Sequence, residues 1–180
     1  MHHQDQLAEL NYKTSRLIIE HIDSVIVTEQ ASQVVLNKIV VLLTPQVTQG
    51  LPPYFHDIDT LKEAEIWLKK MSNESQLFTV SAKNTNDIIG FLFLSGSDNE
   101  EVHLGYLLGD EYWHKGYGSE LLSGLLDYLH QHPFIERLVG GVDKDNIASA
   151  KLLEKVGFTD KEEKHPMVVF YEYIFNHTKN

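Results

Sequence analysis

Two glycines in the segment Lys115-Gly116-Tyr117-Gly118-Ser119-Glu120 are the first residues whose types and spacing point to chemistry. Glycine lets a main chain pass close to a ligand because it carries no side chain. The leucines at 121, 122, 125, 126 and 129 follow with the spacing of one buried helix face. Main-chain N–H groups that open such a helix bind anions. The segment therefore predicts a site for a phosphate-bearing ligand, and His114 and Lys115 would help to bind the phosphate.

The common nucleotide motifs do not fit this segment. A dinucleotide motif, G-x-G-x-x-G, would start at Gly116 and Gly118, but Leu121 stands at its third glycine position. A P-loop needs the pattern G-x-x-x-x-G-K followed by Ser or Thr, which this sequence does not contain. Gly116 and Gly118 are also compatible with a simple tight turn. A generic nucleotide-phosphate binder is therefore the weakest interpretation.

A second informative segment begins at Asn146. It reads Asn-Ile-Ala-Ser-Ala-Lys-Leu-Leu-Glu-Lys-Val-Gly-Phe over residues 146–158. Asn146 is suited to cap a short helix, and Gly157 to end it in a left-handed conformation. The inner face of this helix is predicted to be Ala148, Leu152 and Val156. Capping alone would say nothing about function.

Taken together, the two segments resemble the GNAT superfamily of N-acetyltransferases. The family's glycine loop, Gln/Arg-x-x-Gly-x-Gly/Ala, corresponds to residues 113–118, with Trp113 departing from the usual first residue. The Tyr-Trp pair at 112 and 113, Leu-Gly-Tyr-Leu-Leu at 104–108 and Thr-Ser-Arg-Leu at 14–17 are most similar to the Rim-type subgroup. That subgroup acetylates the N-termini of ribosomal proteins. The resemblance implies a single α/β (α+β) domain whose mixed central sheet has splayed central strands and is flanked by helices.

The resemblance also implies where the co-substrate acetyl-CoA binds. Its pyrophosphate would lie on the glycine loop, its thioester carbonyl near a main-chain N–H of the preceding strand, and its pantetheine arm beside Asn146. The residues predicted in this way to bind the cofactor are Tyr106, Leu107, Leu108, His114, Lys115, Gly116, Tyr117, Gly118, Ser119 and Asn146. No metal site is expected, since the ten histidines include no H-E-x-x-H pattern.

Acetyl transfer to an amine requires a neutral amine, a stabilised oxyanion and a proton for the departing thiolate. In Rim-type enzymes the serine of Asn-x-x-Ser is a candidate general acid, and the resemblance carries this role to Ser149. Rim-type members tend to place a glutamate base in the segment after Gly-Phe, but no residue of 159–166 matches directly. Glu162 or Glu163 would substitute for it, or lie on a solvated turn.

Another candidate base lies on the strand before the glycine loop. Alternation along this strand puts Glu101 and His103 on one face. Other GNAT members use an acidic residue on this strand to relay the amine proton through water, and a histidine can take up a proton near neutral pH. A structural role for His103 and loss of the amine proton directly to water stay open as alternatives.

The predicted reaction is attack of a primary amine on acetyl-CoA in a ternary complex. A protein N-terminus, such as a ribosomal one, and a polyamine or other small amine are both suitable acceptors. The formal net charge of -11 favours a cationic acceptor and argues against nucleic acid as a partner. The alternative from another class is a catalytically inactive module that senses acyl-CoA, which the missing glutamate and Trp113 motivate.

Composition sets the remaining expectations. The 180 residues suffice for one domain spanning 1–180, which we expect to be a monomer or a homodimer. The sequence contains no cysteine, and a cysteine nucleophile is therefore excluded. Because no apolar segment reaches membrane-spanning length, we expect a cytoplasmic protein without a membrane partner.

Periodicity and turn residues predict the order of elements. Helices are expected over 29–43 with Thr28 as cap, from Thr60 or Leu61 to residue 71, after the glycine loop, and between Asn146 and Gly157. A loop rich in proline and aromatic residues separates the first two of these helices, over 44–59. Strands are expected over 16–20, 77–83, 88–94, 102–108, 138–142 and 167–175.

Overall fold

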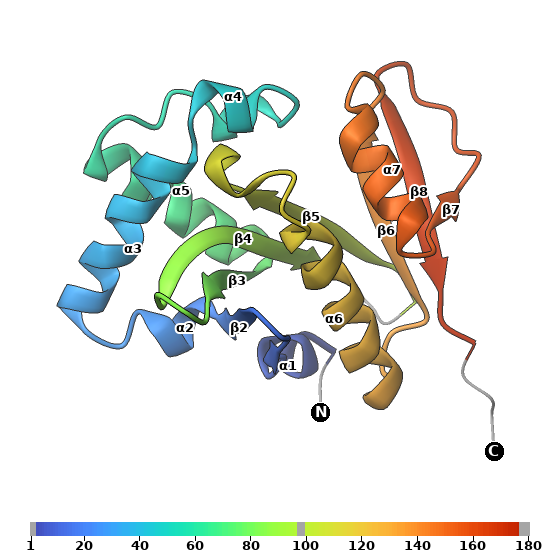
Figure 1. Ribbon diagram of the computed structural model, residues 1–180, viewed down its shortest axis with the longest axis horizontal. Coiled ribbons are helices and arrows are strands. Elements are labelled where there is room, and N and C mark those ends of the chain that lie inside the picture. Colours follow the sequence, from blue (N-terminus) through green and yellow to red (C-terminus); the bar gives the residue numbers. More distant parts are fainter. Residues whose placement is uncertain (1–2, 97–99, 177–180) are drawn as a thin grey trace.

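The computed structural model describes residues 3–96 and 100–176 and contains an eight-stranded sheet with helices on both faces (Figure 1). The strand order is β1-β2-β3-β4-β5-β6-β8-β7. Its strands are β1 (Tyr12–Lys13), β2 (Leu17–His21), β3 (Gln76–Ala82), β4 (Asp87–Ser95), β5 (Val102–Leu108), β6 (Arg137–Asp143), β7 (Thr159–Asp160) and β8 (Val168–Ile174). Only β5 and β6, among these described strands, pair in parallel. The expected mixed α/β sheet is therefore confirmed.

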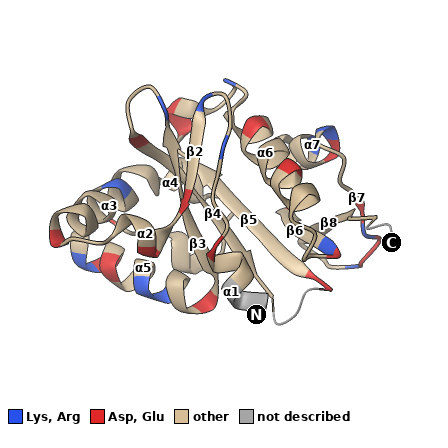
Figure 2. Cartoon of the chain, turned by 90° about the horizontal axis from the view of Figure 1, so that it is seen from below, with Lys and Arg blue, Asp and Glu red and all other residues tan. Residues whose placement is uncertain are grey.

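The helices divide between the two faces of the sheet (Figure 2). They are α1 (His3–Ala8), α2 (Ile22–Val25), α3 (Glu29–Leu42), α4 (Pro45–Thr48), α5 (Leu61–Glu74), α6 (Tyr117–Gln131) and α7 (Ile147–Lys155), with short 3-10 turns η1 (Pro53–Phe55) and η2 (Asp110–Tyr112). One face is covered by α3 and α5, and the other by α6 and α7. The central sheet is thereby the middle of three layers.

Local sequence explains why the long helices begin where they do. The Thr28 hydroxyl accepts a hydrogen bond from the main-chain N–H of Ala31 and so caps α3. At α5, Thr60 and Glu63 form a reciprocal capping box, which satisfies two main-chain donors at once. Two of the predicted helix starts are thus confirmed, and both rest on threonine.

The structure corrects two expectations about local structure. Ala148 does not belong to the inner face of α7, because it is exposed while Leu153 is buried and packs in the core. The loop 44–59 is less irregular than expected, because α4 and η1 form within it. The elements that sequence reasoning missed, α1, β1, α2, α4 and β7, have between two and six residues each, too few for a periodic pattern.

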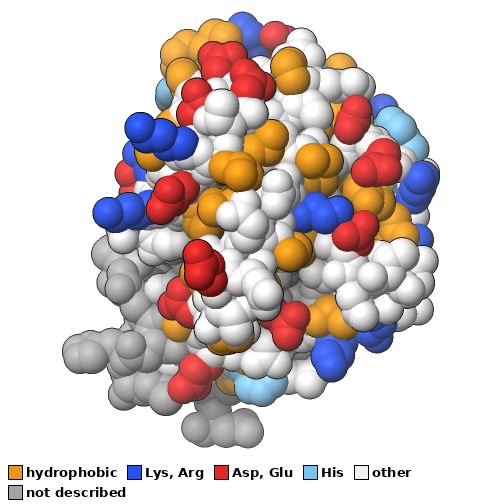
Figure 3. Space-filling model, turned by 90° about the vertical axis from the view of Figure 1, so that its left-hand side faces the viewer, with side chains coloured by type: hydrophobic (Ala, Val, Ile, Leu, Met, Phe, Trp, Pro, Cys, Tyr) orange, Lys and Arg blue, Asp and Glu red, His pale blue; other side chains and the backbone are white. Residues whose placement is uncertain are grey.

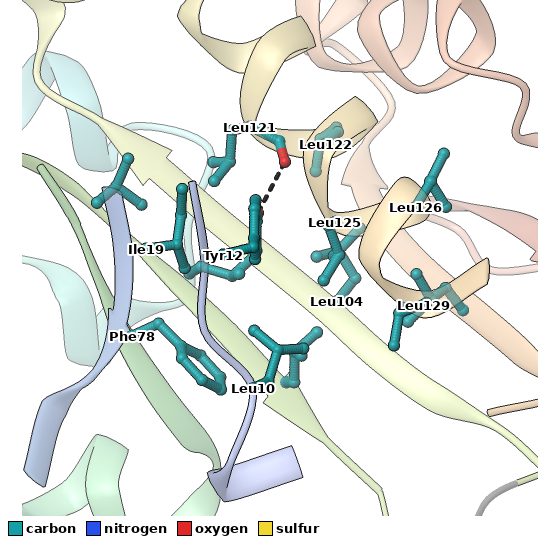
Figure 4. Packing of buried hydrophobic residues seen from close by; sticks show 14 of the residues in the cluster. Leu10, Tyr12, Ile19, Phe78, Leu104, Leu121, Leu122, Leu125, Leu126 and Leu129 are labelled. Carbon is teal, nitrogen blue, oxygen red and sulfur yellow. Dashed lines mark hydrogen bonds between the residues drawn. The ribbon is translucent and has the colours of Figure 1, made fainter. Parts of the chain in front are cut away.

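The core beneath α6 is built from its leucines. Leu121, Leu122, Leu125, Leu126 and Leu129 are all buried, as their spacing predicted, and pack against the sheet (Figure 4). The Tyr12 hydroxyl on β1 donates a 2.8 Å hydrogen bond to the Leu121 carbonyl oxygen. The edge strand is thus tied to the helix that follows the glycine loop.

On the other face, α3 and α5 bury one side against the sheet and present a mixed side to solvent. Exposed apolar residues such as Val34, Val41 and Ile66 lie on these helices. Figure 3 shows that hydrophobic side chains on this side of the molecule are interspersed with acidic and basic ones. None of the helices within 3–96 and 100–176 combines the length and hydropathy of a membrane span.

We predict that Tyr12→Phe lowers the free energy of unfolding by about 1 kcal/mol, since a buried hydrogen bond is lost while the ring is kept. Urea denaturation followed by circular dichroism measures the change. Tyr54→Phe is the matched control, because this ring is 45% exposed, and it should change stability by less than about 0.5 kcal/mol. Equal effects in the two variants would mean that the Tyr12 hydrogen bond does not stabilise the fold.

Candidate active site

The centre of the sheet is open. Parallel pairing between β5 and β6 covers only Val102 with Leu138, His103 with Val139, and Leu104 with Gly140. Beyond these pairs, β5 continues to pair with β4 as far as Leu108, and β6 continues to pair with β8 as far as Asp143. The strands therefore separate after Leu104 and Gly140. This is the splay that the sequence analysis expected.

The glycine loop turns sharply into α6. His114 and Gly116 both have left-handed main-chain conformations, with φ of 58° and 81°. Gly116 occupies the N-cap position of α6, where no side chain caps the helix. The N–H groups that an α-helix leaves without partners in its first turn are therefore not covered by a capping side chain. An anion bound here would find main-chain donors and the positive end of the helix dipole.

The second glycine of the loop allows α6 to approach α7. A Cβ added to Gly118 would stand 2.7 Å from Cδ2 of Leu152, well inside van der Waals contact. A larger residue would force the Leu152 side chain to shift at the contact between the first turn of α6 and the helix that carries Asn146 and Ser149. The glycine spacing thus brings the two sequence motifs together.

Trp113 ties the loop to the end of β5. Its indole N–H donates a 2.9 Å hydrogen bond to the Leu108 carbonyl oxygen, and its ring packs against both hydrophobic clusters. The residue that departs from the usual family pattern therefore holds the loop in place. The Tyr-Trp pair indicated only the family resemblance, and neither this role of Trp113 nor its hydrogen bond was predicted from the sequence.

Asn146 caps α7, as expected. Its Oδ1 accepts a 3.1 Å hydrogen bond from the main-chain N–H of Ser149. Gly50, in the segment between α4 and η1, also lies beside it: a Cβ there would be 3.7 Å from the Asp143 Cβ and 3.8 Å from the Asn146 Nδ2. Part of loop 44–59 therefore packs against the end of β6, next to the splay.

Tyr106 and Ser149 meet on the side of β5 that faces α7. The Tyr106 hydroxyl is buried and makes no hydrogen bond of regular geometry within the described residues, but the Ser149 side chain lies beside it. Burial raises the pKa of Tyr106 to about 12, and the contact with Ser149 opposes this to a smaller extent. For Tyr106 the family resemblance implied only a main-chain contact with the cofactor. The Tyr106 side chain is a site feature that was missed, because nothing local couples it to α7.

Glu101 and His103 lie together, as alternation predicted. The His103 Nε2 is 3.4 Å from the Glu101 Oε1, and the same carboxylate pairs with Lys161 at 3.1 Å and Arg137 at 3.6 Å. Glu101 is thus held within a cluster of positive charges, whereas the His103 side chain is 53% exposed.

The two sets of candidate residues flank β5 rather than meet. Leu104, Tyr106 and Leu108 pack in the cluster that contains the α6 leucines, whereas Leu107 packs in the cluster of α3 and α5. Because side chains alternate along a strand, His103 shares the face of Leu107, opposite to Tyr106. Ser149 and His103 are therefore not brought together; they lie on the two sides of the splayed strand.

The segment after β7 carries the other candidate carboxylates. A surface groove of about 570 Å³ is lined by acidic, basic and apolar residues of this segment: Asp160, Glu162, Glu163, Lys164, His165, Pro166, Val168 and Val169. Glu163 pairs with Lys161 at 3.1 Å, and both Glu162 and Glu163 are exposed. The exposure of these two glutamates fits a solvated turn better than a catalytic base. Among the described residues, no group of three or more His, Asp or Glu side chains is arranged to hold a metal ion.

Known proteins resemble this chain in sequence and in fold. Residues 31–159 match the family model described as acetyltransferase (GNAT) domain. The chain is 30% identical over 120 residues to the uncharacterized N-acetyltransferase p20 of Bacillus licheniformis, a match that covers 63% of this chain and 67% of that protein. It is 23% identical over 90 residues to the uncharacterized N-acetyltransferase YnaD of Bacillus subtilis, covering 49% of this chain and 53% of that one.

Solved structures extend the likeness to nearly the whole fold. A GNAT-family acetyltransferase from Bacillus anthracis superposes with a TM-score of 0.71 at 17% identity, covering 92% of this chain and 98% of that one. RimL, described as a ribosomal L7/L12 alpha-N-protein acetyltransferase in complex with coenzyme A, superposes with a TM-score of 0.72 at 15% identity and the same coverage. The splayed sheet, the glycine loop and the family match over residues 31–159 lead to one conclusion: the chain belongs to the GNAT family and is an N-acetyltransferase.

Proposed function

We propose that this N-acetyltransferase moves the acetyl group of acetyl-CoA to a primary amine by direct attack in a ternary complex. The observation that carries this proposal is the open centre of the sheet, with different chemical groups on its two sides. Two substrates can then approach from the two faces of the sheet and meet at the opening between β5 and β6, without a covalent enzyme intermediate. The absence of cysteine from the sequence agrees with such a route.

The side of β5 that faces α6 and α7 fits acetyl-CoA, which GNAT enzymes use and which would supply an acetyl group activated as a thioester. The uncapped first turn of α6 suits a pyrophosphate, and His114 and Lys115 add positive charge nearby. Asn146 and the buried Tyr106 hydroxyl, which has no regular hydrogen bond in the described residues, offer polar contacts beside the splay. Main-chain groups of residues 106–108 do not pair with β6, and apart from the Leu108 carbonyl, which Trp113 engages, those on the side of the opening can face the ligand.

Ser149 is the proposed proton donor to the departing sulfur. Its main-chain N–H is already used in the Asn146 cap, which fixes the residue at the start of α7. The neighbouring Tyr106 phenol, with a pKa of about 12, stays protonated at neutral pH and can donate a hydrogen bond to the Ser149 hydroxyl. Tyr106 would thus orient the serine, while Ser149 delivers the proton.

The acceptor is proposed to enter from the other side of β5. His103 is exposed there and is positioned by Glu101, so it can accept the amine proton directly or through a water molecule. The carboxylates of Asp160, Glu162 and Glu163 outnumber the single lysine, Lys164, in the groove after β7, and together with the net charge of -11 they favour a cationic acceptor. RimL and a ribosomal-protein-S5-alanine acetyltransferase from Vibrio fischeri share the fold, which supports a protein N-terminus alongside small amines. The cytoplasmic location and the monomeric or homodimeric state remain predictions.

Calorimetric titration with acetyl-CoA tests the function, followed in the same sample by thiol release with spermidine or with short ribosomal-type N-terminal peptides. Binding with turnover would support the proposal and begin to select the acceptor. Binding without turnover for every amine would favour an acyl-CoA sensor. No binding at all would mean that the glycine loop is only a turn, and the proposal would be wrong.

We predict that Ser149→Ala lowers kcat by about 100-fold, because a positioned proton donor is removed. The acetyl-CoA Kd should stay within about twofold, since the Asn146 cap uses the main chain of residue 149. Steady-state kinetics and calorimetry measure the two effects. Ser123→Ala, at an exposed position of α6, is the matched control and should leave both values unchanged. An unchanged kcat in Ser149→Ala would remove this residue from the mechanism.

We predict that His103→Gln lowers kcat by about tenfold or more while acetyl-CoA affinity is kept, because the histidine lies on the acceptor side of β5. Kinetics with saturating acetyl-CoA test this. His132→Gln, at the exposed end of α6, serves as the control for loss of an imidazole. If both variants behave like the wild type, the amine loses its proton to water without help from His103.

A further inference from the structure

The residues between β1 and β2 contact the glycine loop from a distant part of the sequence. The Glu120 carboxylate in the first turn of α6 accepts hydrogen bonds from the Arg16 Nε at 2.6 Å, the Arg16 main-chain N–H at 2.6 Å and the Thr14 hydroxyl at 2.5 Å. Arg16 Nη1 donates a further 2.9 Å hydrogen bond to the Lys115 carbonyl oxygen. The guanidinium carbon also lies 4.3 Å from the centre of the Tyr117 ring. One arginine thus contacts three residues of the 115–120 segment.

We infer that Arg16 is a positioning residue for the acetyl-CoA loop, an inference that rests on the proposed function. It holds the main chain of residues 115–117 in the conformation that directs N–H groups at the pyrophosphate. The loop would therefore consist of two parts: the glycine segment, which supplies the donors, and a distant arginine, which fixes their direction.

The peptide unit between Lys115 and Gly116 shows how Arg16 can act. The carbonyl of one residue and the N–H of the next belong to the same rigid plane and point in nearly opposite directions. Because Arg16 Nη1 holds the Lys115 carbonyl oxygen, the Gly116 N–H is turned away from Arg16. Gly116, with φ of 81°, has a conformation that only its lack of a side chain makes easy, and it would otherwise sample others. The contact selects one of them.

Arg16 also offsets the negative charge of Glu120 beside the glycine loop. A carboxylate in the first turn of α6 would repel a phosphate bound to the same turn, yet Glu120 is ionised. Desolvation raises the pKa of Glu120, but the hydrogen bonds from Thr14 and Arg16 and the charge of Arg16 outweigh it, so that the pKa lies below the ordinary 4.5. The guanidinium of Arg16 neutralises the charge of Glu120. It also lies close to the loop, since its Nη2 is 3.3 Å from the point where a Gly116 Cβ would stand. The neutralised carboxylate and the nearby positive group both favour an anion at the loop.

A simple surface ion pair would not have this consequence. Exposed pairs contribute little to stability, and the Arg16 side chain is 44% exposed. The planar fork of an arginine can hold a carboxylate and a carbonyl oxygen at fixed angles, which the single ammonium of a lysine cannot reproduce. Loss of Arg16 should therefore weaken the binding of acetyl-CoA without unfolding the protein, and a lysine at position 16 should not restore this binding.

The experiment compares two acetyl donors in wild type, Arg16→Gln and Arg16→Lys. Acetyl-CoA carries the pyrophosphate, whereas S-acetylpantetheine lacks it. We expect Arg16→Gln to raise the KM for acetyl-CoA by about tenfold or more, the range set by a lost charge-assisted hydrogen bond, with kcat within about twofold. Arg16→Lys should show most of the same increase in the KM for acetyl-CoA. The kcat/KM for S-acetylpantetheine should stay within about twofold in both variants.

Lys13→Gln is the matched control, because it removes one positive charge from the exposed side of the adjacent strand β1, and its KM should be unchanged. A KM for acetyl-CoA that stays within twofold in Arg16→Gln would overturn the inference. An equal loss with both donors would show a general structural role, and full recovery in Arg16→Lys would show that charge alone acts; either result would also overturn it. If the wild type itself neither binds acetyl-CoA nor releases thiol, the proposed function fails first.

Discussion

The structure depends on the separation of two parallel strands. β5 and β6 pair over three residues and then diverge, although main-chain groups in a sheet are ordinarily satisfied by a neighbouring strand. Each strand remains anchored on its other side, β5 by β4 and β6 by β8. The opening can therefore persist without loosening the sheet. The glycine loop and the start of α7 both lie beside this opening, where main-chain groups are available to a ligand.

Two half-buried carboxylates near the opening, Glu120 and Glu101, are paired with basic side chains. Glu120 is engaged by Arg16 on the side of the glycine loop, and Glu101 by Lys161 and Arg137 on the opposite face. The net charge of -11 is carried mainly by exposed carboxylates. Under the proposed function, this separation would allow an acidic protein to bind a phosphate-bearing ligand on one side of a strand and a cationic acceptor on the other.

Features that depend on local sequence were predictable. The buried leucines of α6, the Asn146 cap and the threonine caps of α3 and α5 each involve residues at most a few turns apart. Of the predicted inner face of α7, Leu152 and Val156 do pack against the core, whereas Ala148 is exposed and Leu153 is the buried residue. The Leu153 side chain approaches Gly140 on β6, a contact that the sequence of a nine-residue helix alone cannot predict.

The contacts that complete the candidate site join residues far apart in the sequence, which periodicity cannot detect. Tyr106 meets Ser149 across an element boundary, Arg16 reaches Glu120 over 104 positions, and Tyr12 reaches Leu121 over 109. This has a consequence for the order of events when the chain is synthesised. The first strands emerge long before the helix that they will hold, and ordering such distant partners is slow. The glycine loop can thus reach the conformation that Arg16 and Tyr12 stabilise only after residue 121 has been added. Asn146 and Ser149 are added later still, so the candidate site is completed late in synthesis.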